Sequence, residues 1–333
     1  MTRLRRDRTG GARLHLLAGA GYLALAIWLT WPTAAHLGEA YFTSGNNLFF
    51  FPATPDAPQN IWNFWWGMRA LSDGQSPFFS PLLYYPQGVQ MLMQTMNIVA
   101  IGLTLPVNGL LGPLAAYNTA AILGVALSGY FGFLLVRAFG GRTAGSLLAG
   151  ALLTACPLHI AKFDSGQLNF VSMQWVILFM LAALALVRLP AHERGWHHDL
   201  VPPLLAALAF LLVLLTDWYW ALVAAAFGGS WMLLALVGAP RPWQLLQRYL
   251  AFGLLAGAAC LPMVMTLLAD GIPDAGQPQG ELWAAYSEGY SSDARGLFFP
   301  AALNPLWSLG AERFLMSVAP HGITEGSYTA AGW

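Results

Sequence analysis

Long apolar runs constrain this chain more than any other feature of its sequence. A bilayer core about 30 Å thick needs roughly 20 apolar helical residues, and inside lipid every backbone amide must be satisfied within its own segment. Charged residues make up only 9% of the chain and hydrophobic ones 57%, whereas about a quarter of a soluble domain is charged. We therefore predict an all-α fold, a polytopic bundle of about seven transmembrane helices. The predicted spans are 14–31, 117–136, 143–158, 171–187, 201–216, 218–237 and 249–269.

The basic residues predict how this bundle is inserted. A further apolar run, 92–111, is interrupted by Asn97, Pro106 and Asn108. If it does not cross, eleven of the fifteen basic residues share the side of the N-terminus, as the positive-inside rule requires of cytoplasmic segments. The eleven are Arg3, Arg5, Arg6, Arg8, Arg13, Arg137, Arg142, Arg188, Arg194, Arg241 and Arg248. We therefore predict a cytoplasmic N-terminus, an uncleaved signal anchor at 14–31, and a helix at 92–111 that lies along or dips into the outer leaflet.

This orientation divides the chain into a basic N-terminus (1–13), a membrane module (14–269) and an extracytoplasmic tail (270–333). Within the module, an outer loop (32–116) and a second outer loop (159–170) face outward. The tail is rich in proline, glycine and aromatic residues and has no closing helix. We expect the chain to continue beyond its last residue.

The first outer loop contains a predicted interfacial helix at 59–72. Trp62 and Trp66 recur at helical spacing, and tryptophan favours the membrane surface because its ring is apolar and its N–H is polar. Asp56 and Gln59 form a capping-box pattern at the start of this helix. The helix is therefore expected to lie parallel to the membrane on its outer side.

Asp56 is the first candidate catalytic residue. A carboxylate just above the bilayer and surrounded by aromatic residues is suited to act as a general base. Glu39 precedes it in the same loop as a candidate substrate-binding residue. Helix capping alone explains Asp56 equally well, and the sequence leaves both interpretations open.

The second outer loop holds the other candidates. Asp164 is a second candidate catalytic acid, and the four candidate substrate-binding residues of this loop are His159, Lys162, Gln167 and Asn169. Lys162 can neutralise a phosphate as a point charge, or extend its ammonium group to the membrane surface as long basic side chains do. A polar turn between two helices would have a similar composition, so a purely structural interpretation also stays open.

Other classes of protein and site are disfavoured. The net charge of zero gives no argument for nucleic acid as a partner. His192, His197 and His198 lack the spacing of a zinc site, so no metal-binding residue is assigned. Asp217 lies between two spans and is interpreted as a turn residue. Nucleotide-binding glycine motifs and the motifs of hydrolases and metalloproteases are absent from the sequence.

Several segments carry a resemblance to a known family. They are Pro55-Asp56 through Trp66, Gly74-Gln75-Ser76-Pro77, Tyr85-Pro86-Gln87-Gly88 and Gly166-Gln167-Leu168-Asn169. With the order of spans and outer loops over 14–187, they resemble the GT-C superfamily, and in particular uncharacterised bacterial members of it. These are membrane glycosyltransferases that use polyprenyl-phosphate-linked sugars.

The resemblance implies an inner-membrane enzyme that transfers a sugar from a polyprenyl-phosphate lipid to an extracytoplasmic glycan, lipid or protein, in contact with membrane lipids. Asp56 matches the first-loop catalytic acid and Asp164 the second-loop acid. Lys162 or Arg69 would offset the charge of the departing lipid phosphate. The paired acids of the family's second loop are not reproduced here, so a divalent cation stays open as the cofactor.

Two alternatives to a transferase remain. A non-catalytic membrane scaffold of GT-C type fits the same residues. A transporter is expected to carry charged or broken helices at the middle of the membrane, whereas the acids of this chain fall at the ends of the predicted spans. The sequence therefore favours a transferase or a scaffold over a transporter.

Overall fold

The structure, a computed structural model, describes residues 8–41, 56–92, 94, 96–188 and 196–270. The chain divides into two compact units, one of Met1–Gly45 and Ala53–Thr266, the other of Asn46–Pro52 and Leu267–Trp333. All contacts below lie within the first unit. The N-terminal residues 1–7 and nearly the whole tail at 270–333 lie outside the described residues.

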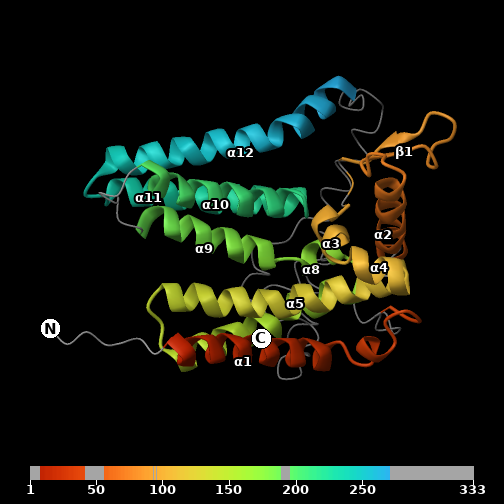
Figure 1. Cartoon of the computed structure of the whole chain (residues 1–333), viewed down its shortest axis with the longest axis horizontal. Coiled ribbons are helices and arrows are strands. Elements are labelled where there is room, and N and C mark those ends of the chain that lie inside the picture. Colours follow the sequence, from red (N-terminus) through yellow and green to blue (C-terminus); the bar gives the residue numbers. More distant parts are fainter. Residues whose placement is uncertain (1–7, 42–55, 93, 95, 189–195, 271–333) are drawn as a thin grey trace, which may run out of the picture. The chain divides into compact units, whose positions relative to one another are not determined.

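The described part of the chain is helical apart from one short hairpin (Figure 1). The elements are α1 (Arg8–Leu29), a 3-10 turn η1 (Thr33–Ala35), α2 (Asp56–Ser72), β1 (Phe79–Ser80), β2 (Val89–Gln90), α3 (Ile98–Leu103), α4 (Leu105–Leu111), α5 (Pro113–Ala138), α6 (Thr143–Thr154), α7 (Pro157–Asp164), α8 (Leu168–Val171), α9 (Gln174–Arg188), α10 (Trp196–Leu214), α11 (Trp218–Val237) and α12 (Pro242–Asp270). In the hairpin, β1 and β2 are antiparallel, with Phe79 opposite Gln90 and Ser80 opposite Val89. The all-α prediction is confirmed.

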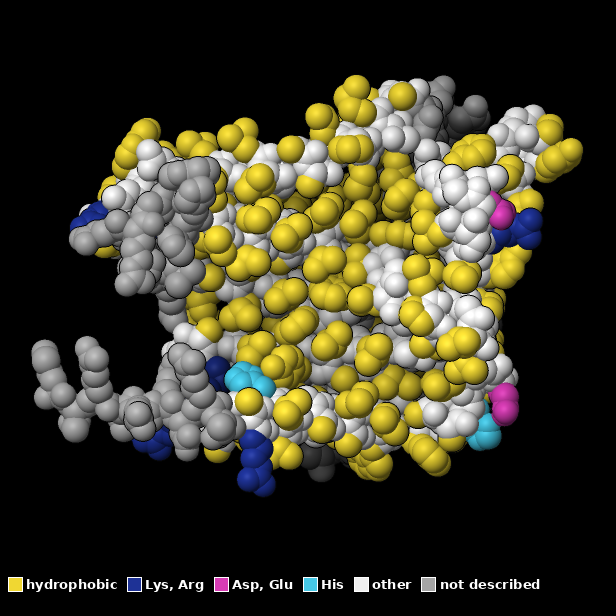
Figure 2. All heavy atoms as spheres, viewed as in Figure 1, with side chains coloured by type: hydrophobic (Ala, Val, Ile, Leu, Met, Phe, Trp, Pro, Cys, Tyr) yellow, Lys and Arg dark blue, Asp and Glu magenta, His cyan; other side chains and the backbone are white. Residues whose placement is uncertain are grey.

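Six helical stretches are long and apolar enough to cross a membrane, where the sequence predicted about seven spans. They are Gly11–Leu29, Pro113–Ala138, Thr143–Asp164, Leu168–Val187, Trp218–Val237 and Pro242–Ala269. The remaining predicted span, 201–216, corresponds to α10, whose apolar part, Leu200–Leu214, is shorter because the helix begins with a polar turn. Figure 2 shows hydrophobic side chains covering most of the face in view. The chain is therefore a membrane protein by the length and surface of its helices.

The long helices run in alternating directions along the bundle (Figure 1), and most charged residues lie near one of its two ends. His15 of α1 contacts Tyr130 near the far end of α5, and Arg248 of α12 donates a hydrogen bond to the backbone of Leu186 in α9. One end, where α5, α9 and α11 finish, carries Arg13, Arg137, Arg142, Arg188, Arg241 and Arg248. The opposite end carries Glu39, Asp56, Asp73, Asp164 and Asp217, together with the basic residues Arg69 and Lys162.

The run 92–111 is broken into α3 and α4, and neither helix is long enough to cross a bilayer. Thr104 separates them, capping α3 through its backbone while its own hydroxyl donates back to Ala100. The run therefore forms no single helix of spanning length, and its position along the outer leaflet stays a prediction. The predicted helix at 59–72 is confirmed, as α2, which begins earlier at Asp56 and runs across the direction of α5 in Figure 1.

One sequence-based boundary was wrong. Most of the predicted second outer loop, 159–170, is helical, because Pro157 starts a new helix, α7, immediately after α6 ends. Proline is favoured in a first turn since that position needs no backbone N–H donor. Only residues 165–167 connect α7 to α8. The polar candidates of this segment are therefore held on rigid backbone.

Two glycines allow α5 and α6 to cross in direct backbone contact. A Cβ atom built on Gly150 would lie 2.6 Å from the carbonyl oxygen of Gly129 and 2.5 Å from Cζ of Tyr22 in α1. Small residues at helix crossings are the usual means by which membrane helices approach each other closely. This crossing joins α1, α5 and α6 at the arginine-bearing half of the bundle.

We expect Gly150→Ala to destabilise the protein by about 1–3 kcal/mol, because the added methyl group meets backbone that cannot move aside. Gly145→Ala, in the same helix, is the control, since a Cβ at Gly145 has no atom within 4 Å. Thermal unfolding in detergent should show a lower melting temperature for the first variant only. Equal melting temperatures would mean that the crossing does not depend on its glycines.

Candidate functional site

The site begins at Asp56, the first residue of α2. Its partly buried carboxylate lies at the amino end of a 17-residue helix, where the backbone dipole favours negative charge. Oδ2 of Asp56 accepts a hydrogen bond of 2.9 Å from Nε2 of Gln167. The first-loop acid and the second-loop amide, 111 residues apart in the chain, are thus in direct contact.

The end of α7 explains why Gln167 reaches Asp56. The backbone N–H of Gln167 donates to the carbonyl of Lys162 at 2.8 Å, and that of Gly166 donates to Phe163 at 2.9 Å. This is the hydrogen-bond pattern of a Schellman motif, in which the residue after the helix is left-handed and is usually glycine. Gly166 has a φ of +74°. The motif turns the chain back so that Gln167 lies beside Lys162.

Gly166 also lets the turn touch the start of α2. A Cβ atom at this position would lie 2.6 Å from Cβ and 2.8 Å from Cα of Ala57, and closer still to its backbone nitrogen. Asn60 holds the two backbones together, since its Nδ2 donates to the carbonyl of Asp56 at 2.9 Å and to that of Gly166 at 3.0 Å. The close approach of the two segments depends on the missing side chain at Gly166.

Lys162 completes a polar chain of three side chains. Its Nζ donates a 2.8 Å hydrogen bond to Oε1 of Gln167 and lies 4.8 Å from the centroid of the Phe170 ring. The side chain is only 8% exposed. A single amide therefore connects a carboxylate to a buried ammonium group, and the two charges fix which way the amide of Gln167 is oriented, because only its nitrogen can donate.

Asn169 and Asp217 form a second polar link at the same end of the bundle. Nδ2 of Asn169 donates to Oδ2 of Asp217 at 2.8 Å. Oδ1 of Asp217 accepts from the backbone of Tyr219 at 2.8 Å and of Trp220 at 3.1 Å, as an N-cap does. Asp217 is therefore the cap of α11, in agreement with its interpretation as a turn residue, and it fastens α8 to α11.

The remaining candidates lie in different surroundings. His159 is fully buried in α7, and its Nε2 has no hydrogen-bond partner within the described part of the chain. Asp164 is the partly buried last residue of α7. Glu39 is exposed, and its Oε2 lies 2.8 Å from Nδ1 of His36. The structure thus brings Asp56, Lys162 and Gln167 together.

Arg69 does not belong to this group. It lies in the last turn of α2 and pairs with Asp73 at 3.5 Å, with more than half of its side chain exposed. Arg69 lies thirteen positions after Asp56 on the same helix, which corresponds to about 20 Å at 1.5 Å per residue. Arg69 therefore cannot act on the same atoms as Asp56 while α2 keeps this position.

Sequence reasoning missed two residues beside Asp56. Asn60 bonds α2 to the turn after α7, and Tyr117, near the start of α5, has its ring centroid 6.2 Å from that of Phe64 and 6.4 Å from that of Phe163. Asn60 lies four residues after Asp56, and residues at this spacing share one face of a helix. The helical spacing could therefore have indicated that Asn60 lies beside Asp56. Nothing in the local sequence marks Tyr117, because its partners come from α2 and α7.

Comparisons with known proteins return no match among family models, curated proteins or solved structures. Among the described residues, no three or more His, Cys, Asp or Glu side chains are grouped so that they could hold a metal ion. The candidate site therefore consists of Asp56, Gln167, Lys162 and the residues around them.

Proposed function

We propose that this protein is a membrane glycosyltransferase of GT-C type, which moves a sugar from a polyprenyl-phosphate donor to an extracytoplasmic acceptor. The observation that supports the proposal best is the contact between Asp56, Gln167 and Lys162. In this contact a general-base candidate and a buried cation lie together, at the end of the helical bundle opposite most of the arginines. A lipid-linked donor presents its phosphate and its sugar at a membrane surface, where both groups would be needed.

In the proposed reaction, Asp56 accepts the proton of an acceptor hydroxyl while the hydroxyl oxygen attacks the anomeric carbon of the sugar. The bond between that carbon and the phosphate oxygen breaks, and its electron pair leaves with the polyprenyl phosphate. Lys162 offsets the negative charge that develops on the departing phosphate. Of the two cations considered from the sequence, Lys162 suits this role and Arg69 does not, because Arg69 lies about 20 Å along α2.

The proposal includes the orientation of the protein in a bacterial plasma membrane, with the arginine-bearing end in the cytoplasm. Most arginines lie at one end and most acids at the other, with Arg69 and Asp199 as exceptions, and this distribution supports the orientation through the positive-inside rule. It requires α10 to cross as a seventh span. The 19 residues of α10 correspond to about 28 Å of helix, close to the thickness of the bilayer core.

Cysteine labelling tests the orientation. In a background with Cys156 and Cys260, the two cysteines of the chain, replaced by serine, we expect Gly140→Cys in the turn between α5 and α6 to resist a membrane-impermeant maleimide applied to intact cells. Asp73→Cys at the other end should be labelled under the same conditions, since Asp73 is about half exposed. Labelling of position 140 from outside would reverse the orientation and remove Asp56 from the outer surface.

Turnover by the purified protein tests the function itself. The protein in lipid nanodiscs is given a panel of radiolabelled polyprenyl-phosphate hexoses with membrane extract as the source of acceptor, and released polyprenyl phosphate is measured. We expect release with at least one donor above the rate without protein. A folded protein that releases nothing from any donor, while it keeps its melting temperature, would favour the non-catalytic scaffold.

A further inference from the structure

Two buried polar atoms beneath the first turn of α2 have no hydrogen-bond partner within the described residues. They are the hydroxyl oxygen of Tyr117 and Oδ1 of Asn60. Tyr117 is 0% exposed and Asn60 is 3% exposed. Most buried polar atoms in native proteins are bonded to protein or to ordered water. Both atoms therefore lack the partner that a buried polar atom normally has, as far as residues 8–41, 56–92, 94, 96–188 and 196–270 are concerned.

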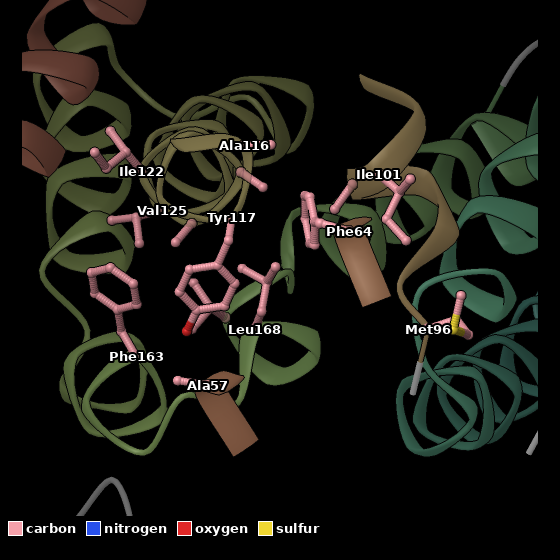
Figure 3. Close-up of a cluster of buried hydrophobic side chains, with 14 of the residues drawn as sticks. Ala57, Phe64, Met96, Ile101, Ala116, Tyr117, Ile122, Val125, Phe163 and Leu168 are labelled. Atoms are coloured by element: carbon pink, nitrogen blue, oxygen red, sulfur yellow. The ribbon is translucent and has the colours of Figure 1, made fainter. Parts of the chain in front are cut away.

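The Tyr117 hydroxyl is directed toward the start of α2. Its ring is packed between Phe64 of α2 and Phe163 of α7, and Figure 3 shows the hydroxyl pointing away from Phe64 and toward Ala57. Ala57 directly follows Asp56 in the first turn of α2. Tyr117 thus presents its polar atom to the inner side of the turn that carries Asp56.

The amide of Asn60 has only one orientation that satisfies its other contacts. Its nitrogen donates to the carbonyl oxygens of Asp56 and Gly166, and a carbonyl oxygen can only accept. Oδ1 is therefore left as an acceptor. Oδ1 of Asn60 calls for a ligand that donates a hydrogen bond, while the Tyr117 hydroxyl can either donate or accept. A hydroxyl group meets both requirements, whereas an anion without a proton does not.

We propose that Tyr117 and Asn60 form a binding site for a hydroxyl ligand directly beneath Asp56. The hydroxyl belongs either to an ordered water molecule or to the sugar of the donor, and the second source rests on the proposed transferase function. With a ligand in place, Asp56 has a hydrogen-bonded neighbour on its inner side in addition to Gln167. Tyr117 and Asn60 then act as positioning residues for whatever Asp56 contacts.

The first test is the melting temperature of Tyr117→Phe without any substrate. Tyr22→Phe is the matched control, since the Tyr22 hydroxyl is also largely buried and donates directly to the carbonyl of Leu147 at 3.1 Å. If water is the ligand, both variants should melt about 2–4 °C lower than the unaltered protein. A truly unpaired hydroxyl gives the opposite sign, because its removal relieves a buried polar group.

The second test applies if Tyr117→Phe melts no lower. A sugar hydroxyl is then the ligand, and the variant should bind polyprenyl-phosphate glucose about tenfold more weakly, as loss of one hydrogen bond predicts. Its affinity for polyprenyl phosphate without sugar should stay unchanged. Unaltered melting together with unaltered affinity for the sugar lipid would overturn the proposal.

The two proposals can fail separately. If the unaltered protein binds neither lipid, the transferase proposal fails, and the melting temperature of Tyr117→Phe alone tests the hydroxyl site. A lower melting temperature of the variant then supports the site, and an unchanged or higher one overturns it. If Tyr117→Phe does not fold, an experimental density map of the unaltered protein decides instead. A peak within about 2.7–3.2 Å of both atoms supports the site, and its absence from maps with and without the sugar lipid overturns it.

Discussion

Replacing Asp56 with asparagine is expected to lower sugar transfer by about 100- to 10,000-fold, the range that a general base contributes. Asparagine keeps the size of the side chain but cannot accept the proton of the acceptor hydroxyl. Its amide can still accept the hydrogen bond from Gln167 through its oxygen, so the contact between α2 and the turn at 165–167 should survive. The measurement is release of polyprenyl phosphate by the purified variant.

Asp73→Asn is the matched control for this loss. Asp73 directly follows α2 at the opposite end from Asp56 and pairs with the exposed Arg69 at 3.5 Å. Exposed ion pairs contribute about 1 kcal/mol or less, so this variant should keep both its melting temperature and its transfer rate. Full activity of Asp56→Asn would remove the general-base assignment, and equal losses in both variants would point to α2 as a whole.

Gly166→Ala is expected to destabilise the protein and to separate Asp56 from Gln167. The left-handed conformation at this position, with a φ of +74°, costs a residue with a Cβ atom roughly 1–2 kcal/mol. The new methyl group would also overlap with the backbone of Ala57, and the turn must move away from α2 to relieve the overlap. We expect a total cost of about 3 kcal/mol or more and a loss of transfer in the fraction that folds.

Gly74→Ala isolates the part of this effect that comes from the close approach. Gly74 has a similar φ of +66° after α2, but a Cβ atom there has no atom within 4 Å. The Gly74→Ala variant should lose only the roughly 1–2 kcal/mol of stability that the left-handed conformation costs, and it should keep its activity. Thermal unfolding of both variants gives the difference, and equal melting temperatures would show that contact between Gly166 and Ala57 does not hold the site together.

Helix positions followed from the sequence because the membrane imposes a simple rule on them. Apolar runs of sufficient length predicted the six spanning stretches and the helix of α10. The distribution of basic residues predicted that the interrupted run 92–111 would not span, and this run forms two short helices. The spacing of Trp62 and Trp66 predicted α2. The spans and α2 follow from residues that are close together in the chain, whereas the inference about 92–111 uses basic residues from Arg3 to Arg248.

The boundaries of the second outer loop did not follow from its composition. Polar residues from His159 to Asn169 predicted a loop, whereas α7 continues as far as Asp164. His159 and Lys162 are nevertheless buried, because neighbouring helices cover them. Local polarity indicated exposure, and tertiary packing overruled it.

Apolar length alone therefore determined that this chain is helical and suited to a membrane, since each span must satisfy its own backbone without help from distant residues. Which residues come together at the site was decided only by the tertiary structure. Asp56 meets Gln167 because Gly166 lacks a side chain against Ala57 and because Asn60 bonds to both segments. Arg69 has the same charge as Lys162 and is nearer to Asp56 in the sequence, but it lies near the other end of α2 and so is far from Asp56 in space. Contacts of this kind depend on packing between separate helices, which sequence spacing does not encode.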